Sequence, residues 1–148
     1  YGGSIVVAYS SLLIVDDDPA LRSCVGELLT VRGHEVHLAA TGGEALEIAR
    51  RTPVHASLLD VQMPGIDGIE TARELRRLRR GLPVVFLTGS TSGELRRRAE
   101  ALPCFAWLAK PVAAGLLLAT VGRLLWTHYP ELAVGRPDPG PGSPGRLA

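Results

Sequence analysis

Lysine is nearly absent from this chain of 148 residues. Of its sixteen basic residues, fifteen are arginines and one, Lys110, is a lysine. The compact ammonium of lysine and the planar guanidinium of arginine are not interchangeable at crowded sites. The one position that retains lysine is therefore a candidate for chemistry that arginine cannot perform.

Cysteine is also scarce, which excludes a fold held together by several disulfides. Cys24 and Cys104 are the two cysteines, and they lie far apart in apolar segments. Cysteines in such segments are usually buried and unpaired. We therefore predict two buried free thiols and a reducing compartment, which for a chain of this kind is the cytoplasm.

Long hydrophobic runs are missing, so the sequence does not predict a membrane span of ~18 apolar residues. The best candidate for a membrane span, residues 112–122, is too short and predicts a core helix. Residues 5–15 superficially resemble the core of a signal peptide, but they lack a preceding basic stretch and run into three aspartates. We expect no membrane association.

A large net charge is absent as well, since the formal net charge is +1. This balance gives no overall attraction to nucleic acid or membranes, and we expect no direct nucleic-acid binding by this domain. Arginine runs within residues 73–80 and 96–98 indicate solvated helix faces, with an anionic partner as the alternative. A hydrophobic content of 46% predicts one globular domain.

That domain is assigned to residues 11–129. Residues 1–10 are interpreted as an N-terminal extension or an artificial remnant. Residues 130–148 contain five of the eleven prolines and four glycines, which predicts a flexible tail or linker.

Short apolar runs alternate with helical patterns five times. Strands are expected at residues 12–15, 35–39, 56–59, 84–87 and 105–108, and helices at about 19–32, 43–51, 69–80, 92–101 and 112–126. Asp18 and Asp67 are expected to cap the first and third helices. This alternation predicts an α/β fold, a parallel sheet with helices on both faces.

Five polar residues follow directly on the predicted strands. They are Asp16, Asp17, Asp60, Thr88 and Lys110. Because ligands of such sheets bind at the carboxyl ends of the strands, we expect these side chains to meet at one edge.

Clustered carboxylates stay ionised together only with a compensating cation, and oxygen ligands of this kind suit Mg²⁺. Lys110 adds a fixed positive charge, and Thr88 adds a hydroxyl. This combination indicates phosphoryl transfer. Asp60 is the expected acceptor, because it stands alone before a loop opened by Pro64 and Gly65.

Residues 13–19 (LIVDDDP), 59–68 (LDVQMPGIDG), 86–89 (FLTG) and 110–111 (KP) resemble the receiver domain of two-component response regulators. The resemblance extends over about residues 11–127 and includes the receivers of chemotaxis regulators. It implies a doubly wound, flavodoxin-like fold with strand order 2-1-3-4-5. It also implies a regulatory phosphoprotein that is not an enzyme with a substrate of its own.

The resemblance further implies functions for single residues. Asp60 would accept a phosphoryl group from a sensor histidine kinase or a phosphotransfer protein. Lys110 would bind that group, Thr88 would move toward it, and Trp107 would act as the switch aromatic. The Mg²⁺ ligands would be Asp17, Asp60 and the backbone carbonyl of Gln62, with Asp16 contributing through a water molecule.

The chain also departs from the family pattern. Residues 101–106 lack the usual glycine and acidic residue, and residues 112–115 lack charges typical of receivers that dimerise through their fourth and fifth helices. The sequence therefore leaves a homodimer open. Phe105 and Trp107 are expected on one face of the last strand. Gln62 and Ser90 are expected to tune the lifetime of the phosphoryl group.

Two alternative functions are weighed against the receiver. Asp16 and Asp18 match the Asp-x-Asp pattern of haloacid-dehalogenase-like phosphatases, which would make Asp16 the nucleophile. That family expects a further acidic pair after the lysine, but residues 111–130 contain none, and Asp60 would have no function. The second alternative is the receiver part of a longer DNA-binding regulator, with the Pro/Gly-rich tail as its linker.

Overall fold

A five-stranded parallel sheet forms the centre of the fold. The computed structural model describes residues 10–89 and 93–133. The strand order is β2-β1-β3-β4-β5, which confirms the predicted topology. The strands are β1 (Ser11–Val15), β2 (Glu35–Ala39), β3 (Ala56–Asp60), β4 (Val84–Thr88) and β5 (Ala106–Ala109).

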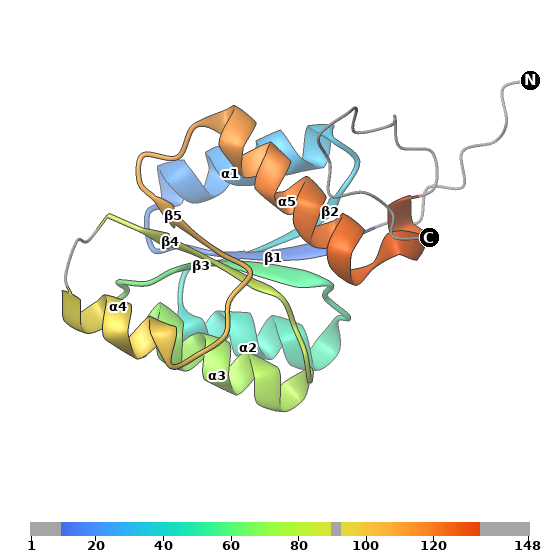
Figure 1. The fold of residues 1–148 in the computed structure, drawn as a ribbon. Coiled ribbons are helices and arrows are strands. Elements are labelled where there is room, and N and C mark those ends of the chain that lie inside the picture. The colour runs from blue at the N-terminus through green and yellow to red at the C-terminus, as the bar shows by residue number, and fades with distance from the viewer. Residues whose placement is uncertain (1–9, 90–92, 134–148) are drawn as a thin grey trace, which may run out of the picture.

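Helices cover both faces of this sheet, as the sequence predicts. They are α1 (Pro19–Val31), α2 (Gly42–Arg51), α3 (Gly68–Leu78), α4 (Gly93–Glu100) and α5 (Ala114–His128). Helices α1 and α5 lie on one face, and α2, α3 and α4 lie on the other (Figure 1). Within the described ranges, no helix is both long and apolar enough to cross a membrane.

Element boundaries differ most in the last third of the chain. Strand β5 begins one residue later than predicted, and α5 begins and ends two residues later. Residues 130–133, which the sequence assigns to the tail, form the 3-10 helix η1 (Pro130–Ala133). The rest of the predicted tail, the proposed extension up to residue 9, Ser90 and the predicted start of α4 at Ser92 lie outside the described residues.

Two apolar layers hold the helices on the sheet. One face of the sheet packs against α2 and α3 around Phe86 and Ile69, and the other packs against α1 and α5 around Ile14 and Leu124. All five residues of β1, β3 and β4 are buried. Parallel strands covered on both faces are continuous apolar runs in sequence, which explains why these strands were predictable.

Both predicted helix caps are confirmed. The Asp18 carboxylate accepts hydrogen bonds from the N–H groups of Ala20 and Leu21. The Asp67 carboxylate accepts one from Glu70 N–H. These bonds satisfy backbone N–H groups that have no partner within the first turn of a helix. They therefore fix the residues at which α1 and α3 begin.

The burial of the cysteines and of one aromatic residue differs from expectation. Cys24 and Cys104 are free, as predicted, but Cys24 is exposed and Cys104 is half-buried. The buried side of α1 includes Val25 and Leu29, and Cys24 lies at the margin of this apolar stripe. Phe105 precedes β5 and packs on the α1/α5 side, whereas Trp107 packs on the opposite layer. The predicted common face is therefore wrong, because period-two alternation applies only inside a strand.

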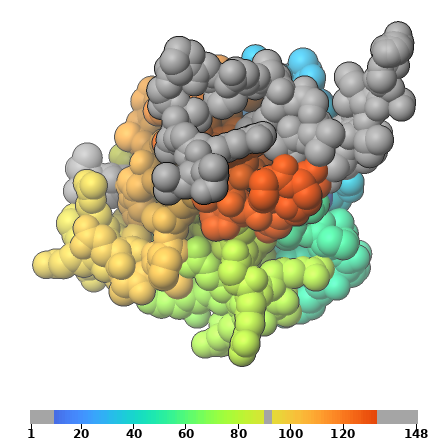
Figure 2. Space-filling model, turned by 45° about the vertical axis from the view of Figure 1, so that its right-hand side comes forward, coloured from blue at the N-terminus to red at the C-terminus, as the bar shows by residue number. Residues whose placement is uncertain are grey.

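The arginines of α3 and α4 are only partly the solvated face that the sequence indicates. Long side chains project from both helices at the surface (Figure 2), and Arg77, with 74% of its side chain exposed, pairs with Glu74 at 2.7 Å. By contrast, the half-buried Arg76 donates to the carbonyl of Leu82. Arg79 donates to the carbonyl of Thr52, just after α2. These two arginines stabilise helix and loop ends.

Candidate functional site

Three carboxylates meet where β1 and β3 end. Asp16 and Asp17 follow β1, and Asp60 is the last residue of the adjacent strand β3. One carboxylate oxygen from each lies within 4.8 Å of the others. Asp16 and Asp60 are buried, whereas Asp17 is exposed and leaves the cluster open to solvent. The convergence predicted for the carboxyl edge of the sheet is thus present.

Lys110 supplies the positive charge of this cluster. It follows β5, and its backbone N–H donates to the carbonyl of Thr88 at 2.8 Å. Its Nζ atom lies 2.8 Å from Asp16 Oδ2 and 3.4 Å from Asp60 Oδ2. The ammonium therefore bridges two carboxylates that would otherwise repel each other.

The charge state of Lys110 follows from these contacts. Burial alone would lower its pKa, because it disfavours the charged ammonium. The hydrogen bond to Asp16 and the negative charges of Asp60 and Asp16 outweigh burial and leave the pKa of Lys110 raised. The cation is therefore present throughout the physiological pH range.

Asp60 is held in an environment that disfavours its own charge. Its pKa is raised from 3.8 to about 6, first by burial and further by the negative charge of Asp16, while Lys110 opposes the shift. Its Oδ1 atom accepts a hydrogen bond from Gln62 N–H at 3.2 Å. The carboxylate is therefore oriented, but burial disfavours its ionised form, which a bound cation would stabilise.

The donor set fits a small divalent cation. All three side chains offer carboxylate oxygens, which suit hard cations such as Mg²⁺. Burial is the largest cause of the raised pKa of Asp60, and a bound cation would oppose it by stabilising the ionised carboxylate. Asp16 is 1% exposed and Asp17 is exposed, so Asp17 is better placed to contact a solvated ion directly.

The other predicted site residues lie around this cluster. Thr88 ends β4 and is buried with 4% exposure, at the same edge of the sheet. Trp107 pairs with Phe86 across the β4–β5 register, and their ring centroids are 5.3 Å apart. Gln62 contributes its N–H group to Asp60. Trp107 thus packs on the core next to β4, which separates its strand β5 from the strand β3 of Asp60.

Two residues that sequence reasoning did not assign to the site also touch it. The Arg22 guanidinium donates to the backbone carbonyl of Asp16 at 2.7 Å. Gly68 lies directly against the backbone carbonyl of Asp60, and its N–H donates to the carbonyl of Val61 at 2.9 Å. The sequence signals for these two residues are weak: Arg22 lies four residues after the cap Asp18, and Gly68 directly follows the cap Asp67.

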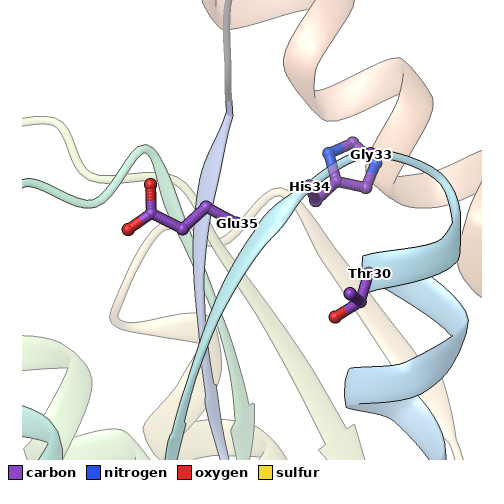
Figure 3. A pocket seen from close by; sticks show the side chains of 4 residues that line it. All are labelled: Thr30, Gly33, His34 and Glu35. Carbon is purple, nitrogen blue, oxygen red and sulfur yellow. The ribbon is translucent and has the colours of Figure 1, made fainter.

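A surface pocket lies at the other end of the sheet. Thr30, Gly33, His34 and Glu35 line it between the end of α1 and the start of β2 (Figure 3). The carboxylate cluster follows the carboxyl ends of the strands, whereas this pocket lies at the amino end of β2. The two features are therefore separate, and the cluster is the candidate site.

Comparison with known proteins identifies the family. The model of the response regulator receiver domain matches residues 12–122. The chain belongs to this family. Response regulator MprA of Mycobacterium leprae (strain TN) is 39% identical over 122 residues, which cover 81% of this chain and 53% of that protein. MprA of Mycobacterium sp. (strain KMS) is 38% identical over 135 residues, or 90% of this chain and 55% of that protein.

Solved receiver structures have the same fold. Chemotaxis protein CheY4 of Vibrio cholerae is 34% identical with a TM-score of 0.74, covering 80% of this chain and all of that one (100%). A CheY-like receiver domain protein from Methanospirillum hungatei JF-1 is 30% identical with a TM-score of 0.79, covering 84% of this chain and 99% of that one. The chain is thus the receiver domain of a two-component response regulator, and it spans about half the length of its curated relatives.

The phosphatase alternative gains no support from this receiver domain. It requires Asp16 as the nucleophile, but Asp16 Oδ1 accepts Asp18 N–H at 2.9 Å and Oδ2 accepts Lys110 at 2.8 Å. Asp16 is also 1% exposed. Both oxygens of this carboxylate are therefore engaged away from solvent.

The burial of charge at Asp60 predicts a gain in stability when the charge is removed. In the metal-free protein, Asp60→Asn should raise the free energy of unfolding at pH 8 by about 1–3 kcal/mol. A carboxyl group with a raised folded pKa destabilises the native state as pH rises from about 4 to about 6, so the gain should vanish at pH 4. Urea unfolding in EDTA at both pH values measures this. A variant less stable than wild type at pH 8 contradicts it.

Proposed function

We propose that this receiver domain is a phosphorylation switch in which Asp60 accepts a phosphoryl group from a histidine kinase or a phosphotransfer protein. The observation that carries the proposal is the position of Asp60. It ends β3 beside two further carboxylates, and Lys110 Nζ lies 3.4 Å from its Oδ2 atom. The domain is regulatory and catalyses only its own phosphorylation and dephosphorylation.

The transfer step requires an ionised Asp60. An oxygen of its carboxylate attacks phosphorus as the P–N bond of the phosphohistidine breaks. The electron pair of that bond returns to the imidazole, which takes up a proton from solvent, and nothing is oxidised or reduced. Lys110 lies where it can neutralise charge on the phosphoryl oxygens.

The three carboxylates would hold a Mg²⁺ ion during this step. The residues that would hold it are Asp16, Asp17, Asp60 and the backbone carbonyl of Gln62. When bound, Mg²⁺ neutralises charge on the transferring phosphoryl group and on Asp60. The buried Asp16 is fixed by Lys110 and by Asp18 N–H, while Asp17 stays exposed and would be the ligand that meets the ion from solvent.

Thr88 and Trp107 are the proposed readout. The Thr88 hydroxyl would donate to a phosphoryl oxygen on Asp60 and move toward it. Trp107 packs on Phe86 in β4, two residues before Thr88, so movement of β4 would reach its ring. The altered face would be formed by α4, β5 and α5, a two-state element biased by a local charge.

Phosphorylation by acetyl phosphate tests the proposal without knowledge of the kinase. Wild-type protein with acetyl phosphate and Mg²⁺ should gain the mass of one phosphoryl group in intact mass spectrometry. The gain should disappear in EDTA and in Asp60→Asn, which removes the nucleophilic oxygen but keeps the shape of the side chain.

Asp18→Asn is the matched control. This substitution makes the same chemical change two residues after Asp16, and asparagine caps helices as well as aspartate does. It should be phosphorylated like wild type. Absence of a phosphoryl group on wild type, or its presence on Asp60→Asn, overturns the assignment.

The output lies beyond this domain. Because the chain spans about half the length of its curated relatives, we propose that an output domain follows it in the natural protein, with the Pro/Gly-rich segment as linker. A DNA-binding output remains an alternative, and the length of the natural gene tests it. Both cysteines are free, which agrees with the cytoplasm as the compartment of this relay.

A further inference from the structure

Arg22 reaches back from α1 to the strand end that holds two of the three carboxylates. It lies four residues after the cap residue Asp18, and its backbone N–H donates to the Asp18 carbonyl at 3.0 Å. Its guanidinium Nη1 donates to the backbone carbonyl of Asp16 at 2.7 Å. A charged donor at this distance makes one of the stronger hydrogen bonds in a protein.

This bond completes the fixation of Asp16. The Asp16 N–H donates to the carbonyl of Ala39 at 3.1 Å. Its carboxylate accepts from Asp18 N–H at 2.9 Å and from Lys110 at 2.8 Å. Arg22 holds the remaining polar group, the carbonyl.

That carbonyl belongs to the peptide that joins Asp16 to Asp17. A peptide unit is planar, so fixing its carbonyl also fixes the direction in which the chain enters Asp17. Asp17 is exposed, so burial does not hold its side chain in place. Its carboxylate nevertheless lies within 4.8 Å of those of Asp16 and Asp60. The orientation of this peptide therefore determines whether three carboxylates can share one cation.

We propose that Arg22 is a positioning residue of the cation site: it clamps the Asp16–Asp17 peptide and thereby strengthens Mg²⁺ binding. The inference goes further than the proposed phosphorylation switch but rests on it only for the identity of the cation. Partners that orient metal ligands without touching the metal typically contribute 10–100-fold to affinity. We expect a contribution at the lower end, because a single bond to a backbone carbonyl is involved.

The sign of the effect separates positioning from simple electrostatics. Arg22 is a cation close to a site that binds a cation, so its charge alone opposes Mg²⁺. If charge dominates, removal of the guanidinium tightens binding. If positioning dominates, removal weakens binding although a repulsive charge has disappeared.

Calorimetric Mg²⁺ titration of the whole chain distinguishes these outcomes. Arg22→Gln is expected to raise the Kd for Mg²⁺ about tenfold. Arg22→Lys keeps a charged donor and should stay within about threefold of wild type. Arg32→Gln removes the same charge from the exposed end of α1 and should bind Mg²⁺ like wild type. Equal or tighter binding by Arg22→Gln overturns the proposal.

Two further measurements keep the outcome clear. If Arg22→Gln unfolds, Arg22→Met keeps the long unbranched stem and good helix propensity and should show the same tenfold loss. The Mg²⁺ concentration that gives half-maximal phosphorylation by acetyl phosphate should rise by the same factor. Mg²⁺ binding without phosphorylation of wild type overturns the proposed switch but not the clamp, whereas unchanged Mg²⁺ affinity in Arg22→Met overturns the clamp.

Discussion

Gly68→Ala is expected to destabilise the receiver domain by roughly 3 kcal/mol and to weaken its Mg²⁺ binding. A Cβ atom on Gly68 would lie 2.0 Å from the backbone oxygen of Asp60 and 2.8 Å from its carbonyl carbon. Both are backbone atoms of a buried strand end, so no flexible side chain can move aside. Either the start of α3 or the strand end that carries Asp60 must shift.

Gly43→Ala is the matched control, because Gly43 also lies in the first turn of a helix. The nearest atom to its added Cβ would be Thr41 Oγ1 at 3.8 Å, an ordinary contact. Chemical unfolding should place Gly43→Ala within about 0.5 kcal/mol of wild type. A Gly68→Ala protein that matches wild type in both unfolding and Mg²⁺ titration contradicts the close packing seen here.

The site could be predicted because parallel sheets place chemistry at a recognisable point in sequence. Asp16 and Thr88 each follow or end an apolar run, since a strand buried on both faces is apolar until it reaches the ligand edge. Asp60 likewise ends β3, whose other residues are all buried. Strand order, by contrast, came from the resemblance, because apolar runs do not specify their neighbours.

The residues that sequence reasoning missed act through backbone atoms. Arg22 contacts the carbonyl of Asp16, and Gly68 contacts the carbonyl of Asp60. Every residue has a backbone carbonyl, so the types of side chain in a sequence do not show which carbonyl will be contacted. The prediction that Cys24 is buried was wrong, since Cys24 is exposed. Helical spacing places it at the margin of the apolar stripe of α1, where burial depends on which neighbours pack against it.

The wrong face for Phe105 has a different cause. It was assigned to the last strand, but β5 begins at Ala106 and Phe105 packs beside His128 of α5, with ring centroids 5.9 Å apart. Because Phe105 lies before the strand begins, the alternation of faces inside a strand does not decide where its ring packs. Boundaries are the weakest part of a sequence-based interpretation, and here one of them decided which aromatic residue lies next to β4.

Lys110→Arg is expected to keep the fold and the positive charge but to abolish switching. Lys110 Nζ is one atom that contacts Asp16 Oδ2 at 2.8 Å and Asp60 Oδ2 at 3.4 Å, at the end of a side chain that is 20% exposed. A guanidinium is a broad planar fork, and in this confined position it would occupy the space of the phosphoryl group. Displacing a positioned cation from the reacting group is expected to lower the rate of group transfer by roughly 100-fold or more.

The measurement uses Trp126→Phe as background, so that Trp107 is the remaining tryptophan. Acetyl phosphate with Mg²⁺ should change Trp107 fluorescence in this background but not after Lys110→Arg. Lys110→Gln, which removes the charge but keeps an unbranched stem, should lose the response to a similar extent. Because the arginine variant retains the charge and the glutamine variant does not, equal loss in both shows that charge alone is insufficient. A wild-type response from Lys110→Arg contradicts the requirement for lysine. The presence of one lysine among sixteen basic residues would then reflect the composition of the chain and not a function of Lys110.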